Sequence, residues 1–216
     1  MTVYMFIMKK ILCYGDSNTW GCSPVDSSRF DENTRWPMVM SSILGNDFLI
    51  LEEGLNGRTV LNLSHDNFML NGIEYIDSLI ENHCPIDIFL LCLGLNDVFI
   101  FEEVTINEIL NGIEKIIDIV NNYHNNKQGC NIPETVIMSP PMFNSNIEWA
   151  QFIELQINKL KELPAAYKRL SIEKNCRFFN TSAYVTGSAI DGSHLDAGSH
   201  ILLGKKIAEF ILGRLK

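Results

Sequence analysis

The chain has 216 residues, of which 46% are hydrophobic and 20% are charged, and its formal net charge is −9 at pH 7. This length and composition are typical of one folded domain with a substantial core, and they exclude a disordered chain. The negative charge argues against nucleic acid as a partner, because a nucleic-acid surface needs clustered Lys and Arg.

The apolar run at residues 2–8 is too short to span a membrane. The Lys9-Lys10 pair follows these apolar residues, whereas the basic residues of a secretory signal precede them. Because Met8 directly precedes this pair, residues 1–8 are predicted to form an extension outside the core. We therefore expect a cytoplasmic protein with no membrane partner.

Five short, mostly apolar segments predict β-strands. They lack a clean alternation of apolar and polar residues, which is typical of strands that are buried on both faces. In chain order they cover residues 10–14, 48–53, 86–93, 135–139 and 177–180.

The spacing of apolar residues and several capping signals predict helices between these strands. The helices are expected after Thr34, over residues 70–82, after Thr105, after Ser145, and from about residue 197 to 215. Pro164 is expected to interrupt the helix after Ser145, because proline removes a backbone hydrogen bond. Strands that alternate with helices indicate an α/β protein with a parallel sheet covered on both faces, here as one domain over residues 1–216.

Polar residues follow the predicted strands in an ordered way. Ser17 lies in a Gly-Asp-Ser turn after the first strand, Gly57 follows the second, and Asn96 follows the third. Asp191 and His194 lie on the long loop after the fifth strand. Because the carboxyl ends of parallel strands line one crevice, these residues are expected to converge there.

Each of these residues has a chemical role in acyl transfer. A serine hydroxyl needs a base, for which His194 is the candidate, and Asp191 would hold the imidazole in the required tautomer. The backbone N–H groups of Ser17 and Gly57 and the side-chain amide of Asn96 would supply an oxyanion hole. This chemistry acts on a small-molecule ester, and we expect neither a metal nor a cofactor.

Structural explanations compete with each assignment. Gly57 in Asn-Gly is an ordinary turn glycine, and Asp191-Gly192 is a common turn pair. Only the joint occurrence of the four loops in order favours a reactive site. The remaining histidines are interpreted as surface or capping residues, and Asp16 and Asp97 as turn-stabilising residues. These histidines are His65, His83, His124 and His200.

Two other groups of residues carry alternatives. Trp20, Met142 and Phe143, with Trp36 and Trp149, are equally consistent with the wall of an acyl or aryl pocket and with core packing. The cysteines lack the spacing of a zinc site, and Cys13 and Cys92 are predicted to be buried free thiols. The six cysteines are at positions 13, 22, 84, 92, 130 and 176.

The four loops together resemble the SGNH, or GDSL-type, hydrolase family. The resemblance rests on Gly15-Asp16-Ser17 with Gly21, on Gly57, on Gly94-x-Asn96-Asp97 and on Asp191-x-x-His194, a span that covers nearly the whole chain. It implies a three-layer αβα, flavodoxin-like fold with a five-stranded parallel sheet of order 2-1-3-4-5. It also implies the same roles for Ser17, His194, Asp191, Gly57 and Asn96.

A further similarity is to the arylesterase and acyltransferase branch of this family. It rests on Thr19-Trp20-Gly21 after the serine, on the segment 52–59, and on Ser139-Pro140-Pro141. The branch implies short acyl esters as substrates, in some members with acyl transfer to alcohols or peroxide, and frequent assembly into oligomers. The chain departs from the family at Asn18, where Leu or Ile is usual, at Leu95, where Thr is frequent, and over residues 61–68, which lack acidic Asp-Pro character.

These observations predict a serine esterase that acts on short-chain carboxylic esters through an acyl-Ser17 intermediate. A carbohydrate O-acetyl esterase or an acyltransferase would use the same residues and stays an alternative, as does a non-catalytic binding module of the same fold. The G-x-S-x-G pattern is absent around Ser17, which argues against the α/β-hydrolase fold. The substrate and the oligomeric state, including a homo-oligomer, stay open.

Overall fold

The sheet of this protein has five parallel strands. The computed structural model describes residues 8–61 and 71–213, so the predicted extension over residues 1–8, apart from Met8, lies outside the described residues, as does His65. The strands are β1 (Lys9–Gly15), β2 (Phe48–Gly54), β3 (Ile88–Cys92), β4 (Glu134–Met138) and β5 (Arg177–Phe179). Their order is β2-β1-β3-β4-β5, which confirms the predicted topology, and each strand end lies within two residues of its predicted position.

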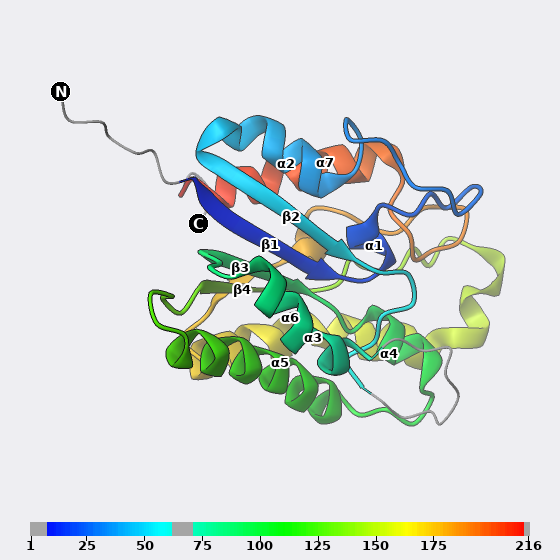
Figure 1. Ribbon diagram of the computed structural model, residues 1–216. Coiled ribbons are helices and arrows are strands. Elements are labelled where there is room, and N and C mark those ends of the chain that lie inside the picture. Colours follow the sequence, from blue (N-terminus) through cyan, green and yellow to red (C-terminus); the bar gives the residue numbers. More distant parts are fainter. Residues whose placement is uncertain (1–7, 62–70, 214–216) are drawn as a thin grey trace.

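Helices cover both faces of the sheet, as the alternating pattern predicts (Figure 1). One face carries α2 (Trp36–Leu44) and α7 (Ala197–Ile211), and the other carries α3 (Gly72–His83), α5 (Ile106–Asn126) and α6 (Glu154–Glu173). The short helices α1 (Ser17–Trp20) and α4 (Leu95–Ile100) follow directly on β1 and β3 at the carboxyl edge of the sheet. Within the described ranges, none of these helices has the length and apolarity needed to cross a bilayer.

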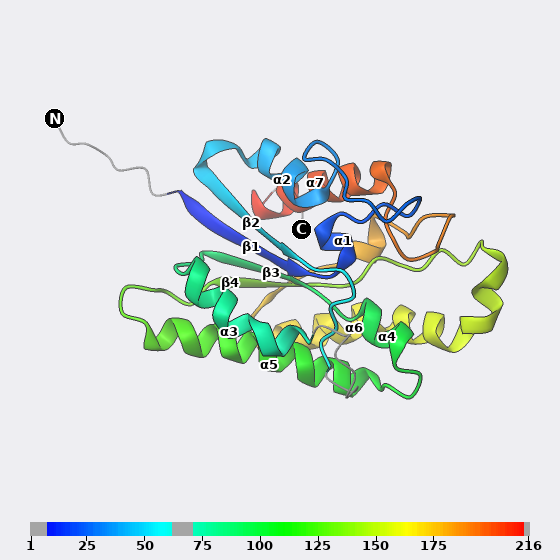
Figure 2. The same ribbon diagram turned by 45° about the vertical axis from the view of Figure 1, so that its right-hand side comes forward.

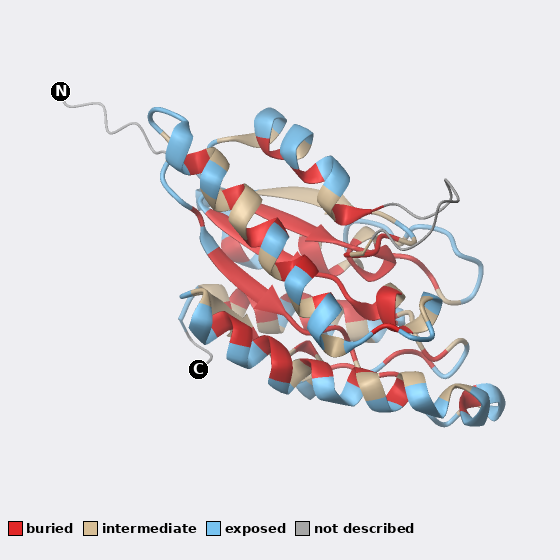
Figure 3. Cartoon of the chain, turned by 90° about the horizontal axis from the view of Figure 1, so that it is seen from below, coloured by how far each residue is buried: buried red, intermediate tan, exposed pale blue. Residues whose placement is uncertain are grey.

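Two apolar clusters fill the space between the sheet and its helices. Alternate residues of β1 contribute to each: Leu12 and Tyr14 pack toward α3 and α5, whereas Ile11 and Cys13 pack toward α2 and α7. Figure 3 shows buried residues along the strands and along one side of the surrounding helices. Because every strand residue from Ile11 to Gly15 is buried, β1 shows no polar alternation, which is what the sequence pattern indicates.

The capping box predicted at Thr105 forms. The Thr105 hydroxyl accepts from the Glu108 N–H at 3.2 Å, and the Glu108 carboxylate accepts from the Thr105 N–H at 2.8 Å. These two bonds satisfy backbone donors that the first turn of α5 would otherwise leave free.

The predictions for the region of α6 are wrong in two details. Ser145 does not cap a helix, because Ile147 precedes a short 3₁₀ segment and α6 begins only at Glu154. Pro164 does not interrupt α6, which runs through it to Glu173. A proline inside a helix costs about 3 kcal/mol or more. The helix continues because its buried side chains hold it against the sheet on both sides of the proline; they include Leu160, Leu163, Tyr167 and Leu170.

The predicted buried thiols are confirmed. Cys13 and Cys92 are buried free cysteines on β1 and β3. The sequence does not indicate that Cys84 and Cys130 meet, yet their Sγ atoms lie 2.7 Å apart. Burial and this contact raise the pKa of Cys84 to about 11, so its thiol is protonated at neutral pH.

Candidate active site

Ser17 is the first residue of α1 and is presented by the turn that ends β1. Asp16 caps this helix, and its Oδ1 atom accepts from the Asn18 N–H at 2.9 Å. The turn requires glycine at position 15, because a Cβ there would lie 2.0 Å from the Thr19 hydroxyl oxygen. The strand, the tight turn and the cap together hold Ser17 at the carboxyl edge of the sheet.

The loop between β5 and α7 brings His194 to Ser17 from the other end of the chain. This loop lies beside α1 in both ribbon views (Figures 1 and 2). The distance between His194 Nε2 and Ser17 Oγ is 3.0 Å, and the distance between His194 Nδ1 and Asp191 Oδ2 is 2.6 Å. Ser17, His194 and Asp191 therefore form one continuous hydrogen-bonded chain.

Asp191 also organises the backbone of its own loop. Its Oδ1 atom accepts from the N–H groups of Ser193 and His194 at 3.1 and 3.0 Å, and from the Ser188 hydroxyl at 3.1 Å. Partial burial raises the pKa of Asp191, but the hydrogen bonds from His194 and Ser193 outweigh it, so the net pKa lies below the ordinary value. Asp191 is therefore a carboxylate that faces the imidazole at neutral pH.

Asp16 has a different environment, although it precedes Ser17. It is almost fully buried, and this burial raises its pKa to about 6 against the opposing effect of the Asn18 N–H. The structure confirms the prediction that Asp16 stabilises the turn, since its side chain caps α1.

The loop after β2 is bound to the loops after β1 and β3. Gly57 has a φ of +77°, a conformation that favours glycine, as a turn assignment predicts. The Arg58 guanidinium lies 4.2 Å from the Tyr14 ring centre and donates to the Gly15 carbonyl at 2.9 Å. The Asn96 side-chain amide donates to the Arg58 carbonyl at 2.9 Å. Gly57 and Asn96 are thus held in one network with the turn that carries Ser17.

Two backbone N–H groups at this edge have no acceptor among the described residues. In the part of the chain that the structure describes, neither the Ser17 N–H nor the Gly57 N–H donates a hydrogen bond to the protein. Donors of this kind are available to an anionic oxygen that develops near Ser17.

The hydrogen bonds of Asp97 reach beyond its own turn, which extends the sequence interpretation. Its fully buried carboxylate reaches back to the preceding loop, where it accepts from the N–H groups of Val60 at 3.0 Å and Leu61 at 2.9 Å. A residue in the first turn of α4 therefore holds the segment that follows Gly57, a contact that no local pattern indicates.

Replacing Asp97 with alanine is expected to lower the free energy of unfolding by about 2–6 kcal/mol, because it leaves two N–H groups without their acceptor at about 1–3 kcal/mol each. Urea-induced unfolding measures the change. Asp97→Asn is the matched control, because it keeps one acceptor oxygen and should lose less. Equal stability of Asp97→Ala and the wild type would contradict this role.

The stability contribution of Asp97 should also depend on pH. Burial raises its pKa to about 6 from an ordinary 3.8, so between these values the folded protein binds a proton that the unfolded chain has released. The free energy of unfolding of the wild type should therefore increase relative to that of Asp97→Asn as the pH falls from about 7 to about 5. A difference that does not change with pH would contradict the shifted pKa.

Two of the other histidines are buried, which corrects their assignment to the surface. His124 is fully buried in α5, and its Nδ1 atom lies 2.8 Å from the Val120 carbonyl. His200 is fully buried in α7, where burial lowers its pKa to about 4 and its Nδ1 atom accepts from the Trp36 N–H. Their positions on the apolar stripes of α5 and α7 are the signal that could have identified them. His83 is half-buried and pairs with Glu53 at 2.6 Å.

The candidate pocket residues have different environments. Phe143 is only 3% exposed and packs against Phe99 and Trp149, with ring centres 5.3 and 5.5 Å apart. This favours core packing for Phe143, and Trp36 is likewise a core residue. Trp20 and Met142 are half-buried, and the Arg29 guanidinium lies 5.5 Å from the Trp20 ring centre.

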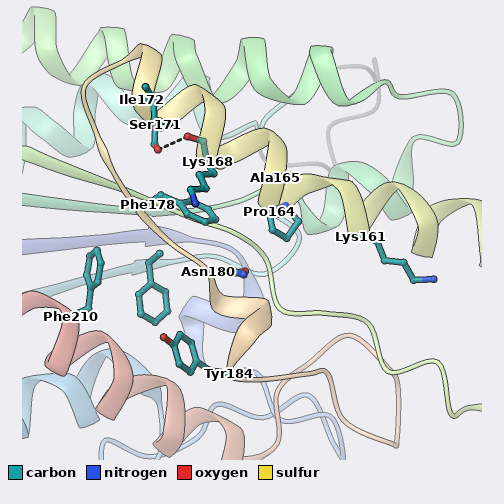
Figure 4. A pocket seen from close by; sticks show the side chains of 11 residues that line it. Lys161, Pro164, Ala165, Lys168, Ser171, Ile172, Phe178, Asn180, Tyr184 and Phe210 are labelled. Carbon is teal, nitrogen blue, oxygen red and sulfur yellow. Dashed lines mark hydrogen bonds between the residues drawn. The ribbon is translucent and has the colours of Figure 1, made fainter. Parts of the chain in front are cut away.

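A cavity of about 640 Å³ lies elsewhere, between α6 and α7 at the β5 edge of the sheet. Figure 4 shows Phe178, Tyr184 and Phe210 along its wall. None of Ser17, Asp191 and His194 lines it, so this cavity is separate from the hydrogen-bonded chain.

Comparisons with known proteins agree with this arrangement. The sequence pattern of the GDSL-like lipase/acylhydrolase family matches residues 13–201. No curated protein matches the chain significantly.

Several solved structures are similar over nearly the full length. An aryl esterase of M. smegmatis is 31% identical with a TM-score of 0.86, and the match covers 96% of this chain and 100% of that one. Est24, a carbohydrate acetylesterase from Sinorhizobium meliloti, is 31% identical with a TM-score of 0.86, covering 95% of this chain and 99% of that one. A putative arylesterase from Agrobacterium tumefaciens is 26% identical with a TM-score of 0.87, covering 96% and 100%.

Proposed function

This chain belongs to the GDSL-like lipase/acylhydrolase family, and we propose that it is a serine esterase that cleaves short-chain carboxylic esters through an acyl-Ser17 intermediate. The family and its esterase neighbours support hydrolysis of an ester bond. The identity of the reacting residues, the acyl chain and the leaving group are our proposal.

The observation that carries the proposal is the chain of hydrogen bonds from Ser17 through His194 to Asp191. The 3.0 Å contact between Ser17 Oγ and His194 Nε2 is within reach for proton transfer. The 2.6 Å contact between His194 Nδ1 and the Asp191 carboxylate places the proton on Nδ1, which leaves Nε2 as the acceptor that faces the serine.

In the first half of the reaction, Ser17 Oγ attacks the ester carbonyl carbon while His194 Nε2 takes the hydroxyl proton. The tetrahedral intermediate then collapses, and His194 returns this proton to the leaving alcohol oxygen as the C–O bond breaks. In the second half, His194 removes a proton from water, which attacks the acyl-enzyme. The acid leaves and Ser17 recovers its proton.

The negative oxygen of each tetrahedral intermediate needs donors that are fixed in place. The N–H groups of Ser17 and Gly57, which bind no acceptor within the described ranges, are candidates. The Asn96 amide has a second hydrogen beside the one that binds the Arg58 carbonyl. Loss of one such donor typically costs on the order of 10²–10³ in rate, so the network that holds these loops matters to catalysis.

Two observations bear on the alternatives. The similarity to Est24, described as a carbohydrate acetylesterase, favours acetylated sugars as a second candidate substrate class. Acyl transfer to an alcohol or peroxide would differ only in the acceptor that attacks the acyl-enzyme. A binding module without catalysis is disfavoured, because the described site contains the nucleophile, the base and the carboxylate in hydrogen-bond contact.

A labelling and hydrolysis experiment tests the proposal. We expect a fluorophosphonate to form one covalent adduct on Ser17, and p-nitrophenyl acetate and butyrate to be hydrolysed faster than the octanoate. The same assay with an acetylated sugar, an added alcohol or peroxide distinguishes the alternatives. A folded protein that forms no adduct and hydrolyses none of these esters would not be an esterase.

A further inference from the structure

Asn18 is the residue at which the chain departs from its family immediately after the candidate nucleophile. It lies in the second position of α1 and is only 1% exposed. A buried amide needs hydrogen-bond partners, whereas the Leu or Ile usual at this position does not. The partners of Asn18 therefore indicate what the amide does in this chain.

Both ends of the Asn18 amide bind the loop that carries His194. Its Nδ2 group donates to the Ser193 carbonyl at 3.2 Å, and its Oδ1 atom accepts from the Leu195 N–H at 2.9 Å. The orientation of the amide is determined, because a carbonyl only accepts and an N–H only donates. The two bonds are made to the residues on either side of His194.

These bonds join two segments that are distant in sequence. Apart from the contact between His194 and Ser17 themselves, they are the only hydrogen bonds between α1 and residues 187–196 in the described ranges. The other bonds of the His194 backbone stay within its own loop, to Asp191 and Ser188. Asp191 thus shapes the loop, and Asn18 attaches it to the helix that starts with Ser17.

We propose that Asn18 is a positioning residue that sets the distance between the Ser17 hydroxyl and the His194 imidazole by binding the backbone on both sides of His194. This inference rests on the proposed function. The Asn18 side chain is only 1% exposed, so it acts through His194 and not on the substrate. Its loss should therefore slow the chemical step and leave substrate binding unchanged, since a displacement of about 1 Å can cost on the order of 10² in rate.

Asn18→Leu is the informative substitution, because leucine is a residue that the family accommodates at this position. We expect kcat for p-nitrophenyl acetate to fall by about 10- to 100-fold, with KM within about twofold of the wild-type value. The rate of Ser17 labelling by a fluorophosphonate should fall by a similar factor. Asn18→Asp keeps the acceptor for the Leu195 N–H but loses the donor, so its kcat should lie between those of the wild type and Asn18→Leu.

Thr19→Val is the matched control. Thr19 is fully buried in the same short helix, and its hydroxyl has no hydrogen-bond partner among the described residues. This variant should keep the wild-type kcat. A kcat for Asn18→Leu within twofold of wild type, or a loss that appears equally in Thr19→Val, would overturn the proposal.

Hydrogen exchange of the Leu195 amide separates this inference from the proposed function. Exchange should be faster in Asn18→Leu than in the wild type and slow in Asn18→Asp, whether or not the protein is active. If the wild type neither hydrolyses esters nor labels at Ser17, the proposed function fails. If the wild type is active but Leu195 exchange and kcat are unchanged in Asn18→Leu, only the positioning role fails.

Discussion

Ser17→Ala is expected to lower kcat by a factor on the order of 10⁴–10⁶ while the protein stays folded. The substitution removes the atom that would form the acyl-enzyme. Among the described residues the Ser17 hydroxyl binds only His194, so the fold loses little when the hydroxyl is removed. Steady-state hydrolysis of p-nitrophenyl acetate measures the loss, and thermal unfolding verifies the fold.

His194→Ala provides the control for Ser17→Ala. Because the two residues act as a unit, the double variant should be no less active than Ser17→Ala alone. Multiplicative losses in the double variant would show that the residues act separately. Wild-type turnover by Ser17→Ala would remove Ser17 from the mechanism.

Asp191→Asn is expected to lower kcat by about 10⁴-fold. The amide nitrogen of asparagine donates where the carboxylate accepts, so the imidazole would turn to the tautomer that carries its proton on Nε2. His194 would then face Ser17 with a donor and could not take the hydroxyl proton. The remaining amide oxygen can still accept from the Ser193 and His194 N–H groups, so the loop should keep its shape.

Ser188→Ala is the matched control for Asp191→Asn. It removes the hydroxyl that donates to Asp191 Oδ1 at 3.1 Å but leaves the carboxylate and its bond to His194 intact. Its kcat should fall by no more than about 10²-fold, since a hydrogen bond to a charged group contributes roughly 1.5–3 kcal/mol. A kcat for Asp191→Asn that is equal to that of Ser188→Ala would contradict the tautomer argument.

The candidate site depends on contacts among loops that follow different strands. Arg58 binds the Gly15 carbonyl, Asn96 binds the Arg58 carbonyl, and Asp97 binds the N–H groups of Val60 and Leu61. If Gly57 and Asn96 act as the proposed oxyanion donors, these bonds orient them before a substrate arrives. Burial raises the pKa of the Asp97 carboxyl to about 6, so keeping it ionised at neutral pH offsets part of the stability that its two hydrogen bonds contribute.

Local sequence patterns predicted the five strands and most of the helices between them, whereas the order of the strands in the sheet was implied by the resemblance to the SGNH family. The apolar runs predict all five strands, because a strand buried on both faces needs apolar residues at nearly every position. The capping box at Thr105 predicts the start of α5, because it depends only on residues three apart. Pro164 shows the limit of such patterns. A proline inside a helix lowers the stability of that helix, but α6 continues through Pro164 because the packing of its buried side chains against the sheet exceeds this loss.

The sequence by itself determined which residues stand at the carboxyl ends of the strands, and so it predicted Ser17, Gly57, Asn96, Asp191 and His194 as one group. Only the tertiary structure decided which side chains of that group form hydrogen bonds with one another, and which residues outside the group hold their loops in place. The hydrogen bonds of Asn18 to the His194 loop and of Asp97 to the loop after Gly57 join residues that are 177 and 37 positions apart. Contacts at such separations depend on how the strands are ordered and packed, and a pattern that is read along the chain carries no information on them.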